Sequence, residues 1–87
     1  MKSISARHRK TLAAVFADPV SGTIKWRDVE AMLVALGAEI SEGSGSRIRA
    51  TLHGDSSVFH RPHPRPETDK GAVKALRRFL TNAGIKP

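Results

Sequence analysis

The chain has 87 residues, of which 39% are hydrophobic and 5% aromatic, enough for one small domain (residues 1–87) with one modest core. It contains no cysteine, so neither disulfides nor a thiolate zinc site can support the fold. Fifteen Lys and Arg residues against eight Asp and Glu give a formal net charge of +7, which favours a polyanion or an acidic protein partner over a basic surface without a ligand. Since the chain has neither a membrane-length apolar stretch nor a secretory signal, we expect a cytoplasmic protein with no membrane partner.

Two helices are predicted in the first part of the chain. Residues 6–17 place apolar side chains at helical spacing, and the sequence DPVSG then stops the helix. Residues 25–36 carry a longer apolar stripe, with Thr23 as the expected N-cap and Gly37 as the expected residue beyond the C-terminus. We expect the first helix to enlarge the core; the alternative is that it gates the sheet or mediates assembly. The apolar side chains of the two helices are Leu12, Val15, Phe16, Trp26, Val29, Met32, Leu33 and Leu36.

Three strands are predicted next, because the apolar period changes to two after Gly37. Residues 38–42 predict a short strand, residues 46–53 a longer one and residues 58–61 a third. Apolar and polar residues alternate along the longer strand, so one face of the sheet is expected in the core and the other in solvent. The sequence GDSS at residues 54–57 is typical of the turn between the last two strands.

The length of that turn decides which side chains share a face of the sheet. It is expected to have an even number of residues, either two at Gly54–Asp55 or four over the whole GDSS sequence. Either length points Phe59 into the core and puts His60 on the face that carries Arg47 and Arg49. An odd length would turn Phe59 to solvent, because a slip of one residue moves every side chain to the other face.

A proline-rich loop over residues 60–66 leads into the last predicted helix, for which Thr68 or Asp69 is the expected N-cap and Gly84 lies just past the end. Its apolar stripe and its cations occupy different arcs, so the cations are expected together on the surface. The stripe consists of Val73, Leu76, Leu80 and Ala83, and the cations are Lys70, Lys74, Arg77 and Arg78. The predicted fold class is α+β of order α-α-β-β-β-α, with helices on one face of a small three-stranded antiparallel sheet.

The open face of this sheet is the candidate site. Arg47 and Arg49 offer planar guanidinium groups that match phosphate oxygens and stack on unpaired bases. The alternative is an ordinary solvated face, which antiparallel sheets often have. The preceding glycine-rich turn lacks a Walker-type sequence, but backbone amides at Gly45 and Ser46 are suited to meeting a phosphate.

The histidines near this face have two possible uses. His60 and His63 are three residues apart, which allows zinc chelation, but no Asp or Glu lies close by in sequence to complete a tetrahedron. We therefore expect no metal and no cofactor. Acid–base chemistry is favoured, because a histidine can take the proton of a ribose 2′-hydroxyl or give one to the leaving 5′-oxygen without a metal ion.

The order of these motifs resembles the HicA family of toxins. The matching pieces are WRDVEAMLVALGAEI (Trp26–Ile40), GSR (Gly45–Arg47), VFHRPH (Val58–His63) and DKGAVKALRRFLTNAGI (Asp69–Ile85). The resemblance covers residues 24–85, with residues 1–23 as an N-terminal helical extension. It implies a fold similar to a double-stranded-RNA-binding domain and metal-independent cleavage of mRNA, as the toxin of a type II toxin–antitoxin pair. It also implies a HicB-family antitoxin that covers the active face.

One residue departs from the family pattern. The resemblance implies that the family's catalytic histidine ends a G-S-H motif, and the residue there is Arg47, which cannot act as a general base because a guanidinium stays protonated at neutral pH. His60 carries the proton transfer instead, or His63 does, which occupies the family's histidine position before the last helix. Alternatively, Arg47 stabilises the transition state while the base comes from elsewhere, or the protein binds RNA or its antitoxin without cutting.

These hypotheses define two sets of candidate residues. A DNA-binding function is the least favoured, since the helices show no helix-turn-helix register. The catalytic candidates are His60, His63 and Arg47. The expected RNA-binding residues are Gly45, Ser46, Arg47, Arg49, Lys70, Lys74, Arg77 and Arg78.

Overall fold

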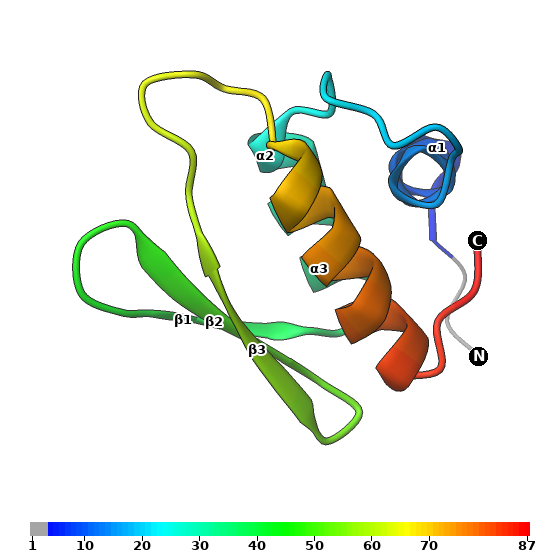
Figure 1. Ribbon diagram of the computed structural model, residues 1–87. Helices are drawn as coiled ribbons and strands as arrows, with labels where there is room; N and C mark the ends of the chain where they lie inside the picture. Colours follow the sequence, from blue (N-terminus) through cyan, green and yellow to red (C-terminus); the bar gives the residue numbers. More distant parts are fainter. Residues whose placement is uncertain (1–3) are drawn as a thin grey trace.

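The computed structural model describes residues 4–87 and has the expected element order (Figure 1). The elements are α1 (Ala6–Val15), α2 (Trp26–Ala35), β1 (Glu39–Glu42), β2 (Arg47–Leu52), β3 (Asp55–His60) and α3 (Lys70–Asn82). The α+β class is confirmed, and the arrangement is consistent with the fold of a double-stranded-RNA-binding domain. None of the helices described in residues 4–87 has the length and apolar character that a membrane crossing requires.

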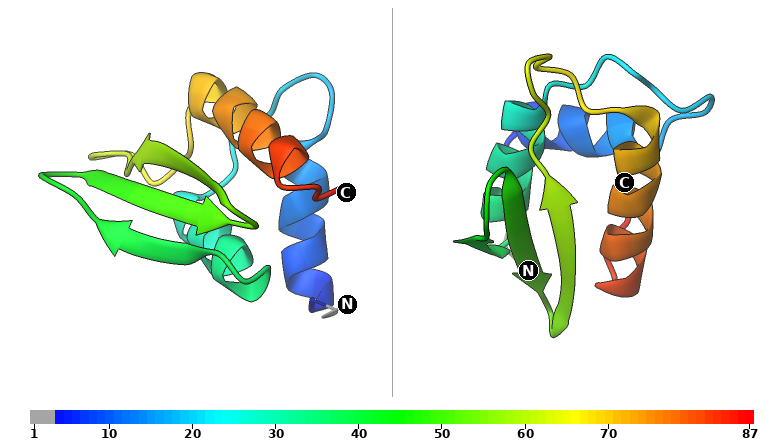
Figure 2. Two further views of the ribbon diagram at one scale, coloured as in Figure 1. Left: turned by 90° about the horizontal axis from the view of Figure 1, so that it is seen from below. Right: turned by 60° about the vertical axis from the view of Figure 1, so that its left-hand side comes forward.

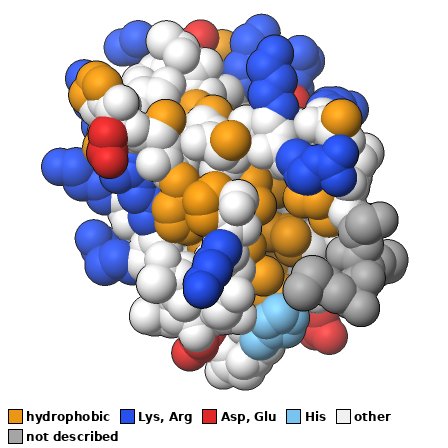
Figure 3. Space-filling model, turned by 90° about the vertical axis from the view of Figure 1, so that its right-hand side faces the viewer, with side chains coloured by type: hydrophobic (Ala, Val, Ile, Leu, Met, Phe, Trp, Pro, Cys, Tyr) orange, Lys and Arg blue, Asp and Glu red, His pale blue; other side chains and the backbone are white. Residues whose placement is uncertain are grey.

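The elements form layers. The sheet has the order β1-β2-β3 with both neighbouring pairs antiparallel. The helices α2 and α3 lie against one side of the sheet, and α1 lies beyond them, on the side away from the strands (Figure 2). Figure 3 shows the side of the molecule on which α1 lies, where Lys and Arg side chains surround a centre of apolar ones.

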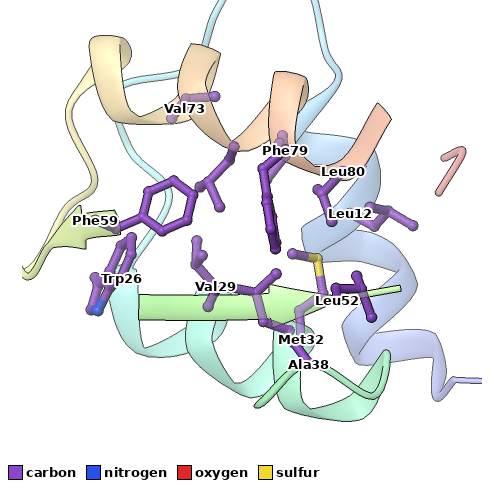
Figure 4. Close-up of a cluster of buried hydrophobic side chains, with 14 of the residues drawn as sticks. Leu12, Trp26, Val29, Met32, Ala38, Leu52, Phe59, Val73, Phe79 and Leu80 are labelled. Atoms are coloured by element: carbon purple, nitrogen blue, oxygen red, sulfur yellow. The ribbon is translucent and has the colours of Figure 1, made fainter. Parts of the chain in front are cut away.

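The core fills the space between these layers, as the apolar patterns predict (Figure 4). β2 contributes the alternate residues Ile48, Ala50 and Leu52 to it, β3 contributes Phe59, and each helix contributes one stripe. Phe59 contacts two other aromatic rings there, with ring centroids 6.1 Å from Trp26 and 5.8 Å from Phe79, the latter edge-on. The first helix adds Leu12 and Val15, both buried, so its predicted role in enlarging the core is confirmed. Burial of each such side chain stabilises the fold by about 1.5–3 kcal/mol.

The helix ends show which capping predictions succeed. Gly37 and Gly84 have φ of 99° and 83°, and the amides at and after each glycine donate back into the last helical turn, so both predicted C-terminal glycines are confirmed. Asp69 is the N-cap of α3, where its carboxylate accepts from the third amide of the helix. The prediction of Thr23 as the cap of α2 is wrong, because Lys25 occupies that position without a side-chain hydrogen bond.

A backbone bridge forms at the start of α2, which has no side-chain cap. The first amide of the helix, at Trp26, donates to the carbonyl of Pro66 at 2.9 Å. The amide of Thr68 donates in the other direction, to the carbonyl of Ile24 at 2.7 Å. These bonds join the start of α2 to the segment that precedes α3, and they give a partner to one amide that the first helical turn leaves open.

The turn between β2 and β3 differs from the prediction in position but not in parity. Its two central residues are His53 and Gly54, with φ of 50° and 86°, which is the pattern of a type I′ turn. Both predicted turns are therefore wrong, and β3 begins at Asp55. The turn still has an even length, so Phe59 is buried and His60 is exposed as predicted.

His53 has a tertiary contact that holds this unusual turn in place. Its ring nitrogen Nδ1 lies 2.7 Å from the carbonyl oxygen of Ala83 at the end of α3, and therefore donates a hydrogen bond to it. The contact joins the tip of the hairpin to the last helix. A histidine in the left-handed region is uncommon, and this bond supplies the compensation.

We expect Gly54→Ala to lower the free energy of unfolding by about 1–2 kcal/mol, because a Cβ at positive φ is strained. No heavy atom lies within 4 Å of the added carbon, so the cost comes from the backbone and not from a clash. Urea denaturation measures it. The matched control is Gly22→Ala, where φ is not positive and the nearest atom, Cε of Lys70, is 3.4 Å away. Equal effects in the two variants would contradict the assignment of the turn.

Candidate nucleic-acid interface

The open face of the sheet displays Arg47, Arg49 and His60, all exposed. Along β2 these arginines alternate with buried Ile48 and Ala50, and β3 shows the same alternation at its end. The predicted grouping of the three polar residues on one face is therefore confirmed. It follows from the pleat of the strands together with the even-length turn.

Arg47 lies directly opposite His60 in the register of the two strands. The hairpin closes on a hydrogen-bonded pair, Leu52 and Asp55, and the pairs alternate from there, so Arg47 and His60 form a non-hydrogen-bonded pair. The bond from the amide of Arg61 to the carbonyl of Ser46, 2.9 Å, fits the same alternation. In such pairs the Cα atoms are about 4.5 Å apart and the side chains are closest. The guanidinium and the imidazole thus leave the sheet side by side.

The glycine-rich turn borders this pair. Gly45 has a φ of 61°, and both Gly45 and Ser46 are exposed at the tip between β1 and β2. The turn is closed by two backbone bonds between Arg47 and the segment before it, to which its side chain adds a weak contact with the carbonyl of Ser44 at 3.5 Å. A hollow of about 270 Å³ opens between this turn and the strands, and its lining includes Arg47, Arg49 and the exposed Val58.

His63 lies in a different hollow, at the start of α3, which we call the α3 hollow. Its volume is about 360 Å³, and it is lined by Gly22, Pro62, His63, Arg65, Glu67, Thr68, Asp69 and Lys70. Neither Arg47 nor His60 contributes to it. The structure therefore divides the two candidate histidines between two places, with His60 beside the arginines of the sheet.

The cations of α3 also fall into two groups. Lys70, Lys74 and Arg78 repeat every four residues along one exposed stripe of the helix. Arg77 is not on display with them. It is half-buried, and its guanidinium donates to the carbonyls of Val15 and Ala17 at the end of α1.

The expectation that all four cations are presented together is therefore wrong for Arg77. An ion pair of 3.3 Å between Arg77 and Asp18 completes this contact. The last carbonyls of α1 have no partner within their own helix, and a guanidinium satisfies them well. The sequence gives no sign of this contact, because it depends on where α1 packs.

Arg61, which follows β3, is another arginine with a tertiary contact that the sequence does not predict. Its guanidinium donates to Glu30 on α2 at 2.9 Å and to Glu42 on β1 at 2.6 Å. The hydrogen bonds from Arg61 lower the pKa of Glu42, while those to Glu42 and then Glu30 raise the pKa of Arg61. This network holds the exit of β3 against the helix layer, directly beyond His60. Only the tertiary fold brings its three residues together.

The geometry can support proton transfer next to a fixed positive charge. An imidazole can exchange a proton with a ribose hydroxyl, and an adjacent guanidinium can bind the phosphate oxygens that become more negative. Among residues 4–87, no three His, Asp or Glu side chains gather as a metal site would require.

Comparison with known proteins identifies one family. The family model for the HicA toxin of bacterial toxin–antitoxin systems matches residues 26–85, which is more than half of the chain. No curated protein and no solved structure gives a significant match. The matched segment begins at the first residue of α2, so α1 and the loop after it lie outside the match.

We expect Glu42 to titrate below its ordinary value of 4.5, and Arg61→Gln to bring its titration back into that range. NMR of the side-chain carboxyl measures both. Since the pKa is lower in the folded state, the interaction stabilises the fold above the unfolded pKa and is lost as the pH falls through the folded pKa. An unchanged titration in the variant would contradict the Arg61 assignment.

We expect Arg77→Met to lower the free energy of unfolding by about 1.5–3 kcal/mol, the range for hydrogen bonds to charged groups. Methionine keeps much of the aliphatic stem and removes the donors. Arg78→Met is the matched control on the adjacent position, which is exposed, and its effect should stay within about 0.5 kcal/mol. Equal unfolding midpoints for the two variants would show that the contact with α1 contributes nothing.

Proposed function

The chain belongs to the HicA family of toxins, and we propose that it acts as an mRNA interferase whose active face is the open side of the sheet. The cleavage uses histidine acid–base chemistry without a metal ion. A HicB-like antitoxin neutralises the protein by covering the same face. Residues 24–85 form the catalytic core in this proposal, and residues 1–23 are an extension of it.

The cross-strand pair of Arg47 and His60 carries the proposal. His60 accepts the proton of a ribose 2′-hydroxyl, and the 2′-oxygen attacks the adjacent phosphorus. The bond from phosphorus to the 5′-oxygen then breaks, and the imidazolium returns the proton to that leaving oxygen. The products are a 2′,3′-cyclic phosphate and a free 5′-hydroxyl. Arg47 binds the phosphate oxygens as their charge grows, which is the task that a guanidinium performs best.

The remaining contacts hold the RNA strand. Arg49 is two residues along β2 on the same face, and the exposed tip at Gly45 and Ser46 presents backbone to a phosphate. The stripe of Lys70, Lys74 and Arg78 adds positive charge on α3. Arg77 is omitted from the RNA-binding set, because its guanidinium binds α1.

A second candidate function rests on Arg47 itself. An arginine at the position where the family has its histidine also suits a module that binds RNA or an antitoxin and does not cut. This candidate predicts that Arg47→Ala and Arg49→Ala weaken binding in a salt-dependent way while the RNA stays whole. A small acidic reading frame beside the gene would favour either form of the toxin–antitoxin function.

We expect the purified protein, free of any antitoxin, to cleave a single-stranded RNA in EDTA, with His60→Ala about 10²–10⁴-fold slower. End-labelled fragments resolved on a gel measure the rate. His63→Ala is the matched control from the α3 hollow and should cleave at close to the original rate. Loss of cleavage in His63→Ala alone would reassign the base. Intact RNA with and without added metal ions would exclude the interferase and leave the binding module.

A further inference from the structure

The N-terminal extension carries a net positive charge because it contains few acidic residues. Four of the fifteen Lys and Arg residues precede position 24, against one of the eight Asp and Glu, so this segment contributes +3 of the net charge of +7. The family match begins only at residue 26. A surface built from the extension is therefore a property of this chain, and the family match does not account for it.

A hollow of about 430 Å³ lies between α1, the loop that follows it and the start of α2; we call it the α1 hollow. Its lining includes Arg7, Lys10, Ser21, Thr23 and Lys25. The hydroxyls of Ser21 and Thr23 are 3.1 Å apart, so they present a pair of polar groups beside the cations. This combination of Lys, Arg and hydroxyl groups is the one with which proteins hold phosphates of nucleic acids.

The acidic side chains that line the two hollows already form hydrogen bonds or ion pairs within the protein. Asp28, in the lining of the α1 hollow, pairs with Arg7 at 3.2 Å. In the α3 hollow, Asp69 caps its own helix, and Glu67 lies 3.9 Å from Arg65. Lysines in the lining of the two hollows supply the remaining positive charge: Lys10, Lys25 and Lys70.

The two hollows share a wall. Ser21 and Thr23 line the α1 hollow, while Gly22 between them lines the α3 hollow. A Cβ at Gly22 would lie 3.4 Å from Cε of Lys70, so the stem of that lysine rests on the wall. A nucleic-acid strand that crosses Gly22 would pass from Lys70 in the α3 hollow to Lys10 and Lys25 in the α1 hollow.

The α3 hollow also lies close to the proposed active face. His60 ends β3, and His63 lines the hollow three residues later, so their Cα atoms are at most about 11 Å apart. Thr68 lines the same hollow, and its buried hydroxyl has no hydrogen-bond partner among the described residues. Buried hydroxyl groups normally have a hydrogen-bond partner.

We propose that the two hollows form a second phosphate track, which binds the sugar–phosphate backbone of the RNA strand as it leaves the cleavage face. Successive phosphates lie in the α3 hollow, cross the wall at Gly22 and reach the α1 hollow. The identity of the ligand as RNA rests on the proposed function. The track contributes affinity and length preference, and it takes no part in the cleavage step.

The test measures binding of 2′-O-methyl RNA, which lacks the attacking hydroxyl and stays whole, by fluorescence anisotropy at several salt concentrations. A short oligonucleotide covers the sheet face only, and a longer one also reaches the track. We expect the double variant Lys10→Gln, Lys25→Gln to bind the longer RNA about tenfold more weakly at low salt. Its salt slope should fall by about 1.4, or about 0.7 for each lost phosphate contact to a single strand. Binding of the short RNA should not change.

Two further variants distinguish a failure of the proposed track from a failure of the proposed function. Arg9→Gln with Lys86→Gln removes the same charge from outside both hollows, and an equal loss of affinity there would overturn the track in favour of net charge alone. Arg49→Gln reports on the sheet face. If it weakens both RNAs while the track variant weakens neither, the track is wrong and the proposed function stands. If the unaltered protein binds neither RNA, the proposed function fails as well.

Discussion

The two-residue turn at His53 and Gly54 fixes the geometry on which the candidate site depends. Because both residues adopt positive φ, β2 and β3 pair in one register only, with Ile48 opposite Phe59 and the next pair exposed. That register buries Phe59 and, by the alternation of the pleat, turns His60 outward beside an arginine. A turn one residue longer would exchange these positions. The hydrogen bond from His53 to the end of α3 therefore supports both the packing and the site.

Hydrogen bonds to backbone atoms join the three helices, in addition to their apolar side chains. Residues Ile24 and Trp26 exchange backbone hydrogen bonds with the segment before α3, and Arg77 satisfies the last carbonyls of α1. Each contact gives a partner to a polar group that a helix end would otherwise leave open. The same contacts place the loop after α1 against the start of α3, with Gly22 beside Lys70. The packing that completes the core thus also brings the basic extension next to the α3 hollow.

Local patterns predicted most of the fold, and tertiary contacts account for the errors. Apolar periodicity found all six elements. The even length of the turn placed His60 on the correct face, although the two-residue turn was assigned one residue too late. The error arose because Gly54–Asp55 is a strong turn signal, whereas a histidine at positive φ is held there by a contact with Ala83, distant in sequence. Thr23 was wrongly predicted as the cap of α2. The helix begins at Trp26, whose amide bonds to Pro66, a residue distant in sequence. In the sequence, Arg77 looks like the exposed cations Lys70, Lys74 and Arg78. It differs from them only because α1 packs beside it and accepts its hydrogen bonds.

Arg47, where the sequence resemblance to the family leads us to expect a histidine, lies in a strand pair whose geometry suits the proposed function. A side chain on β2 and the side chain opposite it on β3 start about 4.5 Å apart in a non-hydrogen-bonded pair, so both can contact one phosphate. On the proposed function, the general base is His60 on β3 and not a residue at position 47 on β2. Because the two positions are opposite each other, the substrate can bind at the same place. Position 47 then holds the permanent positive charge of an arginine next to that base. On the proposed function, such a charge binds the substrate phosphate and stabilises its transition state, two tasks that a neutral imidazole at the same position performs less well.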